Sequence, residues 1–514
     1  MFPGTFATLT PDKPAVIMSD SGAVLTYAEL DDRSVRLANV LREAGLRPGD
    51  GVALLAENRL EFHVVYWAAM RSGLYFTPLN HHLTAAEIVH IVNDCGARAL
   101  VVSSGVAAIA TALLGRTPQV AIRLAVGGPV AGYDDIVASL AAASPEPAAD
   151  QPRGAELLYS SGTTGQPKGI TVPLPGRPVD AYVNPLKRLF GAGYGIADDT
   201  VYLSPAPLYH TAPLRFTGLV HEAGGTVVVM PRFDATAALA AIERYRVTHS
   251  QWVPTMFVRM LKLPDDQRLA HDLSSHRVAV HAAAPCAVEV KRKMIEWWGP
   301  LVEEYYTGSE GLGLTMIDSA TWLRRPGSVG RSVLGVLHVC GDDGEELPAG
   351  QVGTVYFERR AFPFTYHNDP EKTRQARHPE HENWGTAGDL GYVDADGFLF
   401  LTDRADFTII SGGVNIYPQE VENALALHAA VLDLAVFGIP DPEMGEQVMA
   451  VVQPAPQVAV GPDLERELLA YLRERIAHYK VPRRIDFVDT LPRAATGKLR
   501  KHRLRETYLA GARG

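Results

Sequence analysis

A glycine- and hydroxyl-rich stretch, Tyr159–Gly169, carries the strongest chemical signal in this sequence. It reads YSSGTTGQPKG and directly follows a short apolar run. Glycines let a backbone approach a ligand closely with its N–H groups pointing inward, and hydroxyls and a lysine add donors that suit phosphate oxygens. The stretch therefore predicts a phosphate-binding loop, and the alternative is a solvated flexible loop. The candidate ligands are Ser160, Ser161, Gly162, Thr163, Thr164, Gly165 and Lys168.

This loop is not of the Walker A type, because the chain has no G-x-x-x-x-G-K-[ST] sequence and Gly497-Lys498 is followed by Leu499. Further short motifs follow it. They are YTGSE at 306–310, TAGD at 386–389, RAD at 404–406, SGGVNIYP at 411–418 and PRAATGK at 492–498. In this order and at this spacing they resemble the motifs of the acyl-adenylate-forming superfamily, which includes acyl-CoA synthetases, peptide-synthetase adenylation domains and firefly luciferase. The resemblance covers nearly the whole chain.

The resemblance implies a reaction in two steps. A carboxylate is a poor electrophile, because its charge repels nucleophiles and oxide is a poor leaving group. Transfer of AMP from ATP turns that oxygen into a good leaving group and expels pyrophosphate, after which coenzyme A takes the acyl group. Negative charge gathers on the α-phosphoryl oxygens, so the site must supply cations and hydrogen-bond donors there. The expected ligands are therefore ATP, Mg²⁺, coenzyme A and a small carboxylic acid.

The resemblance also implies a role for each motif residue in the first step. Lys498 is expected to bridge the carboxylate and the α-phosphate, and its alternative is a solvated lysine in a basic tail. Glu310 is expected to bind Mg²⁺, since a hard carboxylate suits a hard cation. Ser309, which replaces the threonine of the family, would add a hydroxyl to the α-phosphate. Thr307 replaces a glycine of the family, and this departure leaves open how tightly the segment turns.

The nucleoside is expected to be held by three of these motifs. Tyr306 would pack on the adenine face, Asp389 would bind the ribose hydroxyls, and Arg404 would reach ribose or phosphate. For the acidic residues the alternative is a surface salt bridge. The other positions expected to line the nucleotide are Thr307, Gly308, Ala283 and Ala284.

The second step has its own candidate residues. In the resembling family a small domain rotates between the two reactions, and Asp406 matches the pivot. After rotation a glycine loop lines a narrow tunnel for pantetheine, where side chains would block passage. Lys480 and Arg483 are candidates for the nucleotide phosphates of coenzyme A, and a solvated basic turn is an equal alternative. The residues expected to line the tunnel are Ser411, Gly412 and Gly413.

The acid-binding pocket is expected to be apolar. His210 matches a position that gates the acyl pocket in similar ligases and is included among the catalytic candidates. The segment Leu208–Leu214 contains no acidic residue to hold an amino group, which disfavours a free α-amino acid. A fatty, aromatic or alicyclic acid, including a steroid side-chain acid, is therefore predicted, with core packing as the alternative for a lone histidine or tryptophan. The other expected pocket positions are Trp252, Val253, Ala282 and Gly308.

The elements that must position these residues alternate between helical and strand patterns, which predicts an α/β fold with largely parallel sheets. Capping boxes at Thr26–Glu29 and Thr84–Glu87 open two of the helices. The sequence pattern changes near 404–406, where a charged segment leads into a glycine pair. We therefore predict a large N-terminal domain of layered α/β subdomains over 1–403 and a small mobile α+β domain over 404–514, with the hinge at about 404–406.

Composition narrows the function further. The 514 residues are 47% hydrophobic and 21% charged, as in an ordinary globular protein, and the net charge of −10 disfavours binding to nucleic acid or anionic membrane. The three cysteines are far apart, which favours neither a disulfide framework nor a zinc site. No secretory signal or integral membrane segment is predicted, so a cytoplasmic location is expected. A homodimer is left open.

Three rival functions remain. The same fold could load an acyl group onto the phosphopantetheine of a carrier protein, or oxidise the adenylate as luciferase does. A rival from another class is an inactive ATP- or AMP-binding module. The presence of Lys498, Glu310 and Asp389 argues against that last reading.

Overall fold

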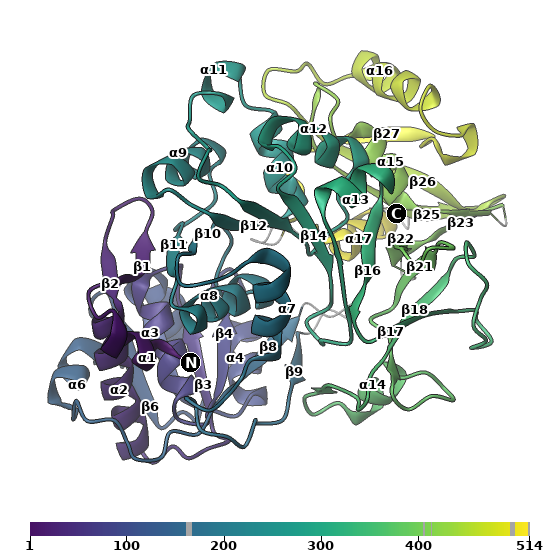
Figure 1. Ribbon diagram of the computed structural model, residues 1–514. Helices are drawn as coiled ribbons and strands as arrows, with labels where there is room; N and C mark the ends of the chain where they lie inside the picture. The colour runs from purple at the N-terminus through teal and green to yellow at the C-terminus, as the bar shows by residue number, and fades with distance from the viewer. Residues whose placement is uncertain (161–166, 405–406, 413, 494–498, 512–514) are drawn as a thin grey trace. The chain divides into compact units, whose positions relative to one another are not determined.

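In the computed structural model the described residues are 1–160, 167–404, 407–412, 414–493 and 499–511 (Figure 1). Within these ranges, only the backbone is described at Ser160, Asp403, Arg404 and Ala510. The chain divides into two compact units. Unit 1 comprises residues 1–251, 271–278 and 363–374, and unit 2 comprises residues 252–270, 279–362 and 375–514.

One sheet of unit 1 contains the strands on either side of the predicted phosphate loop. Its strand order is β19-β9-β8-β4-β3-β5-β6-β7. Neighbours from β8 to β7 are parallel, whereas β9 is antiparallel to both β8 and β19. The strands are β3 (Gly51–Leu55), β4 (Tyr75–Leu79), β5 (Ala97–Ser103), β6 (Ile122–Val126), β7 (Asp134–Asp135), β8 (Ala155–Ser160), β9 (Lys168–Thr171) and β19 (Thr365–Tyr366).

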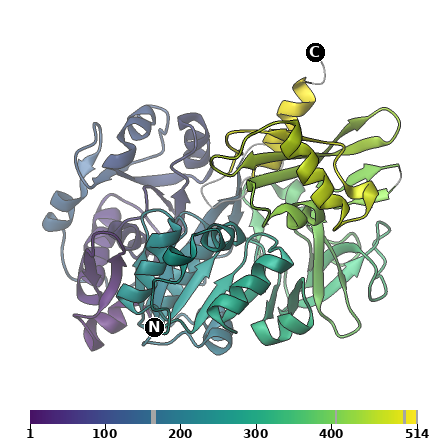
Figure 2. The ribbon, with the colours of Figure 1, turned by 90° about the horizontal axis from the view of Figure 1, so that it is seen from above.

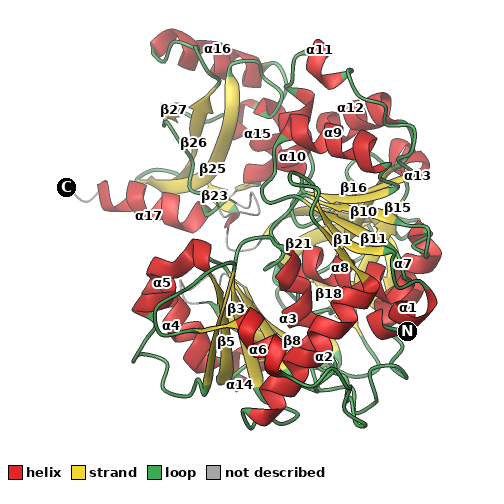
Figure 3. Cartoon of the chain, turned by 90° about the vertical axis from the view of Figure 1, so that its left-hand side faces the viewer, coloured by secondary structure: helices red, strands yellow, loops and turns green. Residues whose placement is uncertain are grey.

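Helices lie on both sides of this sheet (Figure 3). On one side, α4 (Ala85–Asp94) and α5 (Ala107–Ala112) bury apolar side chains against β3, β5 and β6. On the other side, α3 (Leu60–Met70) is buried at every residue from Phe62 to Met70, as expected of a helix enclosed all round. The remaining helices of unit 1 include α1 (Pro3–Leu9), α2 (Tyr27–Glu43), α6 (Ile136–Ala142) and α7 (Pro185–Tyr194).

Both predicted capping boxes are present. Thr26 accepts the backbone N–H of Glu29 at the start of α2, and Thr84 accepts that of Glu87 at the start of α4. In each case the glutamate reaches back to the N–H of the capping residue. These reciprocal hydrogen bonds satisfy backbone donors that the first turn of a helix leaves unpaired.

A second group of strands completes unit 1. β10 (Val201–Ser204), β11 (Thr226–Val229) and β1 (Pro14–Met18) run parallel, β12 (His249–Trp252) is parallel to β10, and β2 (Val24–Thr26) is antiparallel to β1. The strands of the parallel part are almost wholly buried, which is typical when helices cover a parallel sheet. The helices that pack on it are α8 (Thr211–Ala223) and α9 (Ala235–Tyr245) (Figure 1).

Unit 2 contains a sheet that is mostly antiparallel. β13 and β14 are parallel, and from β14 onward each neighbour in the order β14-β15-β16-β22-β21-β18-β17 is antiparallel. The strands are β13 (Val278–His281), β14 (Val302–Tyr306), β15 (Leu314–Ile317), β16 (Ser328–Leu334), β17 (Val336–Cys340), β18 (Gly353–Glu358), β21 (Asp389–Val393) and β22 (Leu399–Arg404). The helices in this part of unit 2 are α10 (Pro254–Leu261), α11 (Asp265–Arg268), α12 (Val288–Trp298) and α13 (Ser319–Arg324).

The last part of unit 2 builds its own α+β core. The sheet has the order β24-β23-β26-β25, with β27 beside β26. Side chains of β25 and β26 alternate between two apolar clusters, one containing residues of α15 and α16 and the other containing residues of α17. Figures 2 and 3 show this last part of the chain as a sheet with helices beside it. The elements are β23 (Ile409–Ser411), β24 (Val414–Ile416), α15 (Pro418–Leu425), β25 (Val431–Asp441), β26 (Gly445–Pro454), α16 (Pro462–Arg473), β27 (Arg484–Phe487) and α17 (Lys501–Gly511).

The predicted fold class, with a large α/β part and a smaller C-terminal α+β part, is confirmed. The expectation of largely parallel sheets is correct for unit 1 and wrong for most of unit 2. In unit 2, short turns join β21 to β22 and β25 to β26, and turns this short can join only antiparallel neighbours. The predicted boundary at 404–406 falls within unit 2 and stays a prediction.

Candidate active site

The ends of the predicted phosphate loop are set by a β-hairpin in unit 1. β8 leads into the loop and β9 leads out of it, and they pair with Tyr159 opposite Gly169 and Ser160 opposite Lys168. The predicted ligands on the loop itself lie outside the described residues, namely Ser161, Gly162, Thr163, Thr164 and Gly165. Ser160 is described by its backbone alone. Lys168 is the first residue of β9 and is half-buried.

Close packing behind this hairpin explains one of its glycines. A Cβ atom on Gly169 would lie 2.9 Å from Cβ of His367 and 3.1 Å from the ring of Tyr159, so no side chain fits without displacement. The hydroxyl of Tyr159 donates a 2.5 Å hydrogen bond to Oδ2 of Asp94, at the end of α4. Burial and the neighbouring Lys372 lower the pKa of Lys168 to about 8.

Two predicted nucleotide ligands from different motifs meet in unit 2. Tyr306 is the last residue of β14 and Asp389 is the first residue of β21, and the Tyr306 hydroxyl donates a 2.6 Å hydrogen bond to Oδ2 of Asp389. The ring of Tyr306 also lies 6.2 Å from that of Phe357. A flat ring beside a carboxylate provides one surface for a purine and acceptors for ribose hydroxyls.

Thr307, the residue that departs from the family pattern, stabilises the turn after Tyr306. The Thr307 hydroxyl donates a 2.5 Å hydrogen bond to the backbone oxygen of Gly313. Within the turn, the N–H of Gly311 donates to the carbonyl of Gly308 at 3.1 Å. A Cβ on Gly308 would lie 2.7 Å from Oε2 of Glu310, so a side chain there would displace that carboxylate. Thr307 therefore closes the turn from outside and keeps it compact.

Ser309 and Glu310 lie half-buried in this turn, as two adjacent oxygen-bearing side chains. Among the described residues, no group of three or more His, Cys, Asp or Glu side chains is arranged to hold a metal. A single carboxylate is nevertheless the donor set that suits Mg²⁺ in a nucleotide site, because the ion keeps waters and takes its other ligands from the phosphates. The residues present fit that ion.

The segment predicted to face adenine and acid follows β13. Ala283 has a φ of +73°, in the left-handed region that costs a non-glycine residue roughly 1–2 kcal/mol. Ala283 and Ala284 are exposed and Ala282 is buried, with its N–H 3.3 Å from the carbonyl oxygen of Trp252. Backbone strain of this kind is concentrated at functional sites, which supports the assignment of this segment.

Trp252 lies in the core of unit 2. Its side chain is 1% exposed, and its ring lies 6.2 Å from Phe257 and 5.5 Å from Trp298. This environment agrees with the core-packing alternative for Trp252. The neighbouring Val253 is half-buried and precedes α10.

The sequence did not predict a buried ion pair beside the end of β13, the strand that leads into Ala282–Ala284. Lys291 of α12 and Glu304 of β14 are almost fully buried, and Nζ lies 2.6 Å from Oε2. The Glu304 carboxylate is also 3.4 Å from Nε2 of His281, the last residue of β13. Burial raises the pKa of Glu304, and burial together with Lys291 lowers the pKa of His281 well below its usual value. Lys291 stands in the run KRK at 291–293 of an amphipathic helix, a pattern typical of a solvated basic face that gives no sequence signal for such a partner.

The loop that carries His210 is positioned by an asparagine that sequence reasoning also missed. Asn58 donates from Nδ2 to the carbonyl oxygens of Ala206 (3.1 Å) and Met230 (2.8 Å), and its Oδ1 accepts the N–H of Leu208 at 2.8 Å. The loop is thereby tied at two points just before His210. No periodicity or motif marks a single buried asparagine.

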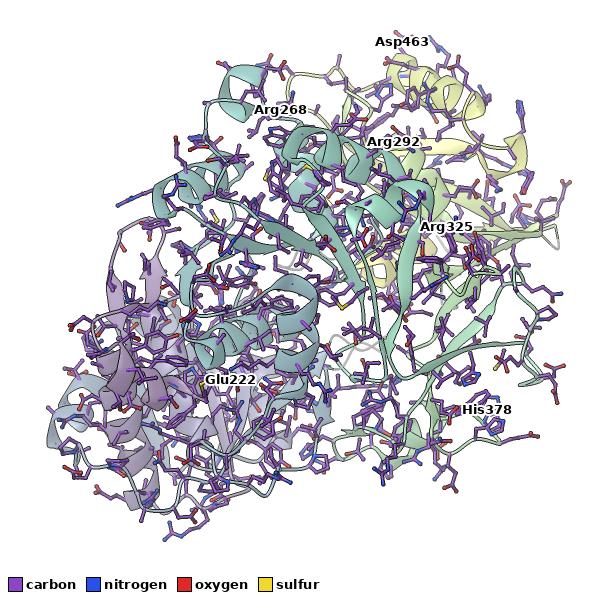
Figure 4. The ribbon with its side chains drawn as sticks, viewed as in Figure 1. Glu222, Arg268, Arg292, Arg325, His378 and Asp463 are labelled. Atoms are coloured by element: carbon purple, nitrogen blue, oxygen red, sulfur yellow. The ribbon has the colours of Figure 1, made fainter. Side chains whose placement is uncertain are left out.

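His210 itself is half-buried at the start of α8 and lies in an aromatic group. Its ring is 4.4 Å from that of Tyr209, which in turn is 5.5 Å from the ring of His81. Near the other end of α8 lies Glu222, which Figure 4 labels. Its carboxylate pairs with Arg153 at 3.0 Å, and both side chains are almost fully buried. Burial raises the pKa of Glu222, and Arg153 opposes that effect. These contacts fix both ends of the helix that follows His210.

The C-terminal candidates lie in the β23–β24 hairpin and in the segment just before β27. Ser411 pairs with Val414 in the β23–β24 hairpin, and Gly412 has a φ of +58°. This left-handed conformation favours glycine, and the end of the Met444 side chain lies close to Gly412. Gly413 lies outside the described residues. Both basic candidates for coenzyme A are engaged in ion pairs, Lys480 with Glu420 at 2.6 Å and Arg483 with Asp441 at 2.9 Å.

The remaining predicted residues are not described in full. The backbone of Arg404 pairs with that of Asp389 across β22 and β21, which places two nucleotide motifs side by side. Asp406 and Lys498 lie outside the described residues. The ends of the segment that contains Lys498 are joined by a bridge between Arg493 and Leu499.

Comparison with known proteins identifies the family of this chain. Residues 5–362 match the family model described as AMP-binding enzyme, and residues 420–498 match that of the AMP-binding enzyme C-terminal domain. A feruloyl-CoA synthase from Amycolatopsis sp. is 35% identical over 98% of this chain and 97% of its own length. The long-chain-fatty-acid–CoA ligase FadD13 of Mycobacterium tuberculosis is 31% identical over 98% of this chain and 97% of its own length.

A solved structure shows the same fold. The anthranilate CoA ligase AuaEII in complex with anthranoyl-AMP superimposes with a TM-score of 0.87 and 27% sequence identity, covering 100% of this chain and 97% of that one. The chain belongs to the AMP-binding enzyme family, in the class of ATP-dependent, AMP-forming acid–thiol ligases. In that class it is an acyl-CoA ligase. Within the part of the chain that the structure describes, no helix is long and apolar enough to cross a membrane.

Proposed function

We propose that this acyl-CoA ligase uses ATP and Mg²⁺ to adenylate an apolar monocarboxylic acid and then transfers the acyl group to coenzyme A. The contact between Tyr306 and Asp389 is the observation that carries the proposal, because it unites two nucleotide motifs that are far apart in the sequence. A purine ring on Tyr306 would bring its ribose to Asp389. Arg404, on the strand beside Asp389, is proposed to reach the ribose or the phosphates.

The phosphate chemistry is assigned to three groups. Glu310 would hold Mg²⁺, which would neutralise charge that develops on the phosphates. Ser309 would donate its hydroxyl to the α-phosphate, and the compact turn closed by Thr307 supports that placement. Lys498 is proposed to bridge the carboxylate and the α-phosphate, on the basis of the motif in which it stands. Stabilisation of developing charge by such fixed donors is commonly the largest single contribution to catalysis.

The surroundings of His210 support an apolar acid as the substrate. The segment Leu208–Leu214 contains no acidic residue that could hold an ammonium group. Next to His210 lie the rings of Tyr209 and His81, and burial is the main cause that lowers the pKa of His81, which favours a neutral imidazole there. The relatives named above act on an aryl acid and on long-chain fatty acids, as their names state. Both acids are largely apolar.

The thioester step is assigned to the C-terminal part. Gly412 and Gly413 are proposed to line the pantetheine tunnel, and the left-handed φ of +58° at Gly412 supports glycine at that position. Asp406 is proposed as the pivot between a domain of 1–403 and one of 404–514. Use of Lys480 and Arg483 for coenzyme A would require their ion pairs with Glu420 and Asp441 to open.

The decisive experiment is carboxylate-dependent release of AMP in the presence of coenzyme A. A panel of alkyl, aryl and alicyclic acids would be compared with amino acids and dicarboxylates, and a carrier protein bearing phosphopantetheine would replace coenzyme A in a parallel series. We expect turnover with the apolar acids and coenzyme A. Release of AMP with amino acids or dicarboxylates alone would overturn the assignment of the acid, and transfer to the carrier alone would overturn that of the acceptor. A cytoplasmic location and a homodimer stay predictions, the latter to be measured by light scattering.

A further inference from the structure

A strap of unit 1 brings a second lysine to the exit of the phosphate loop. The strap is the segment Thr365–Arg374, which is far from Lys168 in the sequence but belongs to the same unit. Its strand β19 pairs with β9, with Thr365 opposite Thr171 and Tyr366 opposite Ile170. The N–H of the next residue in the strap donates to the carbonyl oxygen of Gly169 at 2.8 Å. The strap therefore follows β9 toward Lys168.

The strap turns over the end of α4, where Asp94 holds it. Nε2 of His367 lies 2.9 Å from the Asp94 carbonyl oxygen, and Asn368 donates from Nδ2 to Oδ1 of Asp94 at 3.1 Å. The other carboxylate oxygen of Asp94 accepts from Tyr159, in the strand that leads into the phosphate loop. Asn368 has a φ of +56°, the left-handed conformation that asparagine tolerates and that a sharp turn requires. One carboxylate thus fixes the strap and the loop's entry strand together.

After this turn the chain enters α14 (Pro370–Gln375), which carries Lys372. The N–H of Lys372 donates to Oδ1 of Asp369 at 2.9 Å, and the Lys372 ammonium lies 5.5 Å from the centroid of the Tyr366 ring. Tyr366 lies opposite Ile170 in the β9–β19 pair, and Lys168 is two residues from Ile170, so the side chains of Tyr366 and Lys168 project from the same face of the sheet. The Lys372 ammonium, which lies over the Tyr366 ring, is therefore on the side of Lys168, and its nearness is one cause of the lowered pKa of Lys168. Asp369, whose carboxylate accepts the N–H of Lys372, is an acidic group that opposes the lowering of the Lys168 pKa.

Two ammonium groups held this close repel each other unless an anion lies against both. A pyrophosphate group has several charged oxygens and can accept charge-assisted hydrogen bonds from two lysines at once. We propose that Lys168 and Lys372 together bind the pyrophosphate end of ATP and the pyrophosphate released from it, an inference that rests on the adenylating function proposed above. Lys372 is the new element, since neither its residue type nor its distance from the glycine-rich motif marks it as a ligand.

Titration calorimetry with inorganic pyrophosphate and with AMP tests this inference on the full chain. Lys372→Ala should weaken pyrophosphate binding about tenfold, the size expected for loss of one charge-assisted hydrogen bond, while AMP binding changes less than about twofold. Lys372→Gln should behave like the alanine variant, and Lys372→Arg should keep most of the affinity. The matched control is Arg374→Ala, which removes one positive charge from the same helix, where Arg374 pairs with Glu371.

The outcomes separate this inference from the proposed function. Retained AMP binding shows that each variant is folded. Equal pyrophosphate affinity in Lys372→Ala, Arg374→Ala and wild type would overturn the role of Lys372, even if the enzyme forms acyl-CoA normally. If instead the wild type released no AMP with any acid, while Lys372→Ala still lost pyrophosphate affinity selectively, the proposed substrate would be wrong and the pyrophosphate site would stand.

Discussion

At the scale of single residues, variants of Tyr306 and Asp389 distinguish two contributions to nucleotide binding. One is the tyrosine hydroxyl that positions the carboxylate, and the other is the carboxylate itself. Tyr306→Phe removes the hydroxyl but keeps the ring that is expected to pack on adenine. We expect the KM for ATP to rise about 3- to 10-fold, because one hydrogen bond that positions a carboxylate is lost. Asp389→Ala removes the proposed ribose ligand itself and should cost at least tenfold more. Steady-state kinetics at saturating acid measure both.

Two outcomes with these variants would contradict the proposed roles of Tyr306 and Asp389. If Tyr306→Phe left the KM for ATP unchanged, the hydroxyl would not position Asp389. If both variants lowered kcat alone, the two residues would act on the chemical step instead of on nucleotide binding.

Lys168 allows a prediction about pH. Burial and Lys372 lower its pKa to about 8, whereas an ordinary lysine has a pKa of about 10.4. The neutral amine is the nucleophile, and its share rises as pH passes through the pKa. We therefore expect Lys168 to be acetylated by acetic anhydride on the order of tenfold faster than the exposed Lys293 at pH 8, with a midpoint near that pH. Peptide mass spectrometry between pH 7 and 10 measures the rates.

Two further conditions make this prediction specific to the lysine pair. ATP or pyrophosphate should slow the modification, because an anion stabilises the charged form of Lys168. Lys372→Ala should shift the midpoint to higher pH, since one of the causes of the lowered pKa is removed while burial remains. A midpoint near 10.4 in the wild type would contradict the proximity of the two ammonium groups.

At the scale of elements, the ion pair of Lys291 and Glu304 joins α12 to β14 and lies beside the end of β13. Both strands lead directly into proposed nucleotide-binding segments, at Tyr306 and at Ala282–Ala284. The Lys291 ammonium also lies 4.9 Å from the centroid of the Trp322 ring. A buried pair of this kind adds little net stability compared with apolar side chains, but loss of one partner leaves a buried charge without compensation.

We therefore expect Lys291→Met to lower the free energy of unfolding by about 3–5 kcal/mol. The double variant Lys291→Met with Glu304→Leu should recover most of that loss. In the single variant, burial still raises the pKa of Glu304 and Lys291 no longer opposes it, so the deficit should grow as pH rises through that pKa. Urea unfolding at pH 5 and pH 8 tests this. A single variant as stable as the wild type at both pH values would show that Glu304 is solvated.

At the scale of the whole molecule, one chain must catalyse two half-reactions with different groups. Lys498 is assigned to the first and the glycine loop around Gly412 to the second. Lys498→Ala should lower adenylation by about 10²-fold or more, the effect of removing one donor to developing charge. Thioester formation from supplied acyl-AMP should remain close to that of the wild type. Pyrophosphate exchange measures the first half-reaction, and consumption of coenzyme A measures the second.

Equal losses in the two half-reactions would point to a folding defect in the C-terminal part. Unfolding curves of the variant distinguish that case. Selective loss of adenylation would support the assignment of Lys498 to the first half-reaction.

The sequence by itself determined the family, the class of reaction and the elements whose signals are local. Both capping boxes form as predicted because each needs only residues three positions apart. The order of the motifs sufficed for the family because each motif carries its chemistry within a few residues. The sequence showed that Thr307 departs from the family pattern but not what its hydroxyl binds. Its partner is the backbone oxygen of Gly313, and a backbone acceptor cannot be recognised from the residue type.

Only the tertiary structure decided which distant side chains meet. The pairing of β19 with β9 brings Lys372 to Lys168, and the register of that pair is set by packing and backbone hydrogen bonds along the whole strap. The same holds for Lys291 and Glu304, whose charges would each be assigned to a solvated surface from the sequence alone. A lysine's chemistry depends on burial and on neighbouring charges, and both are properties of the folded chain that no short motif contains.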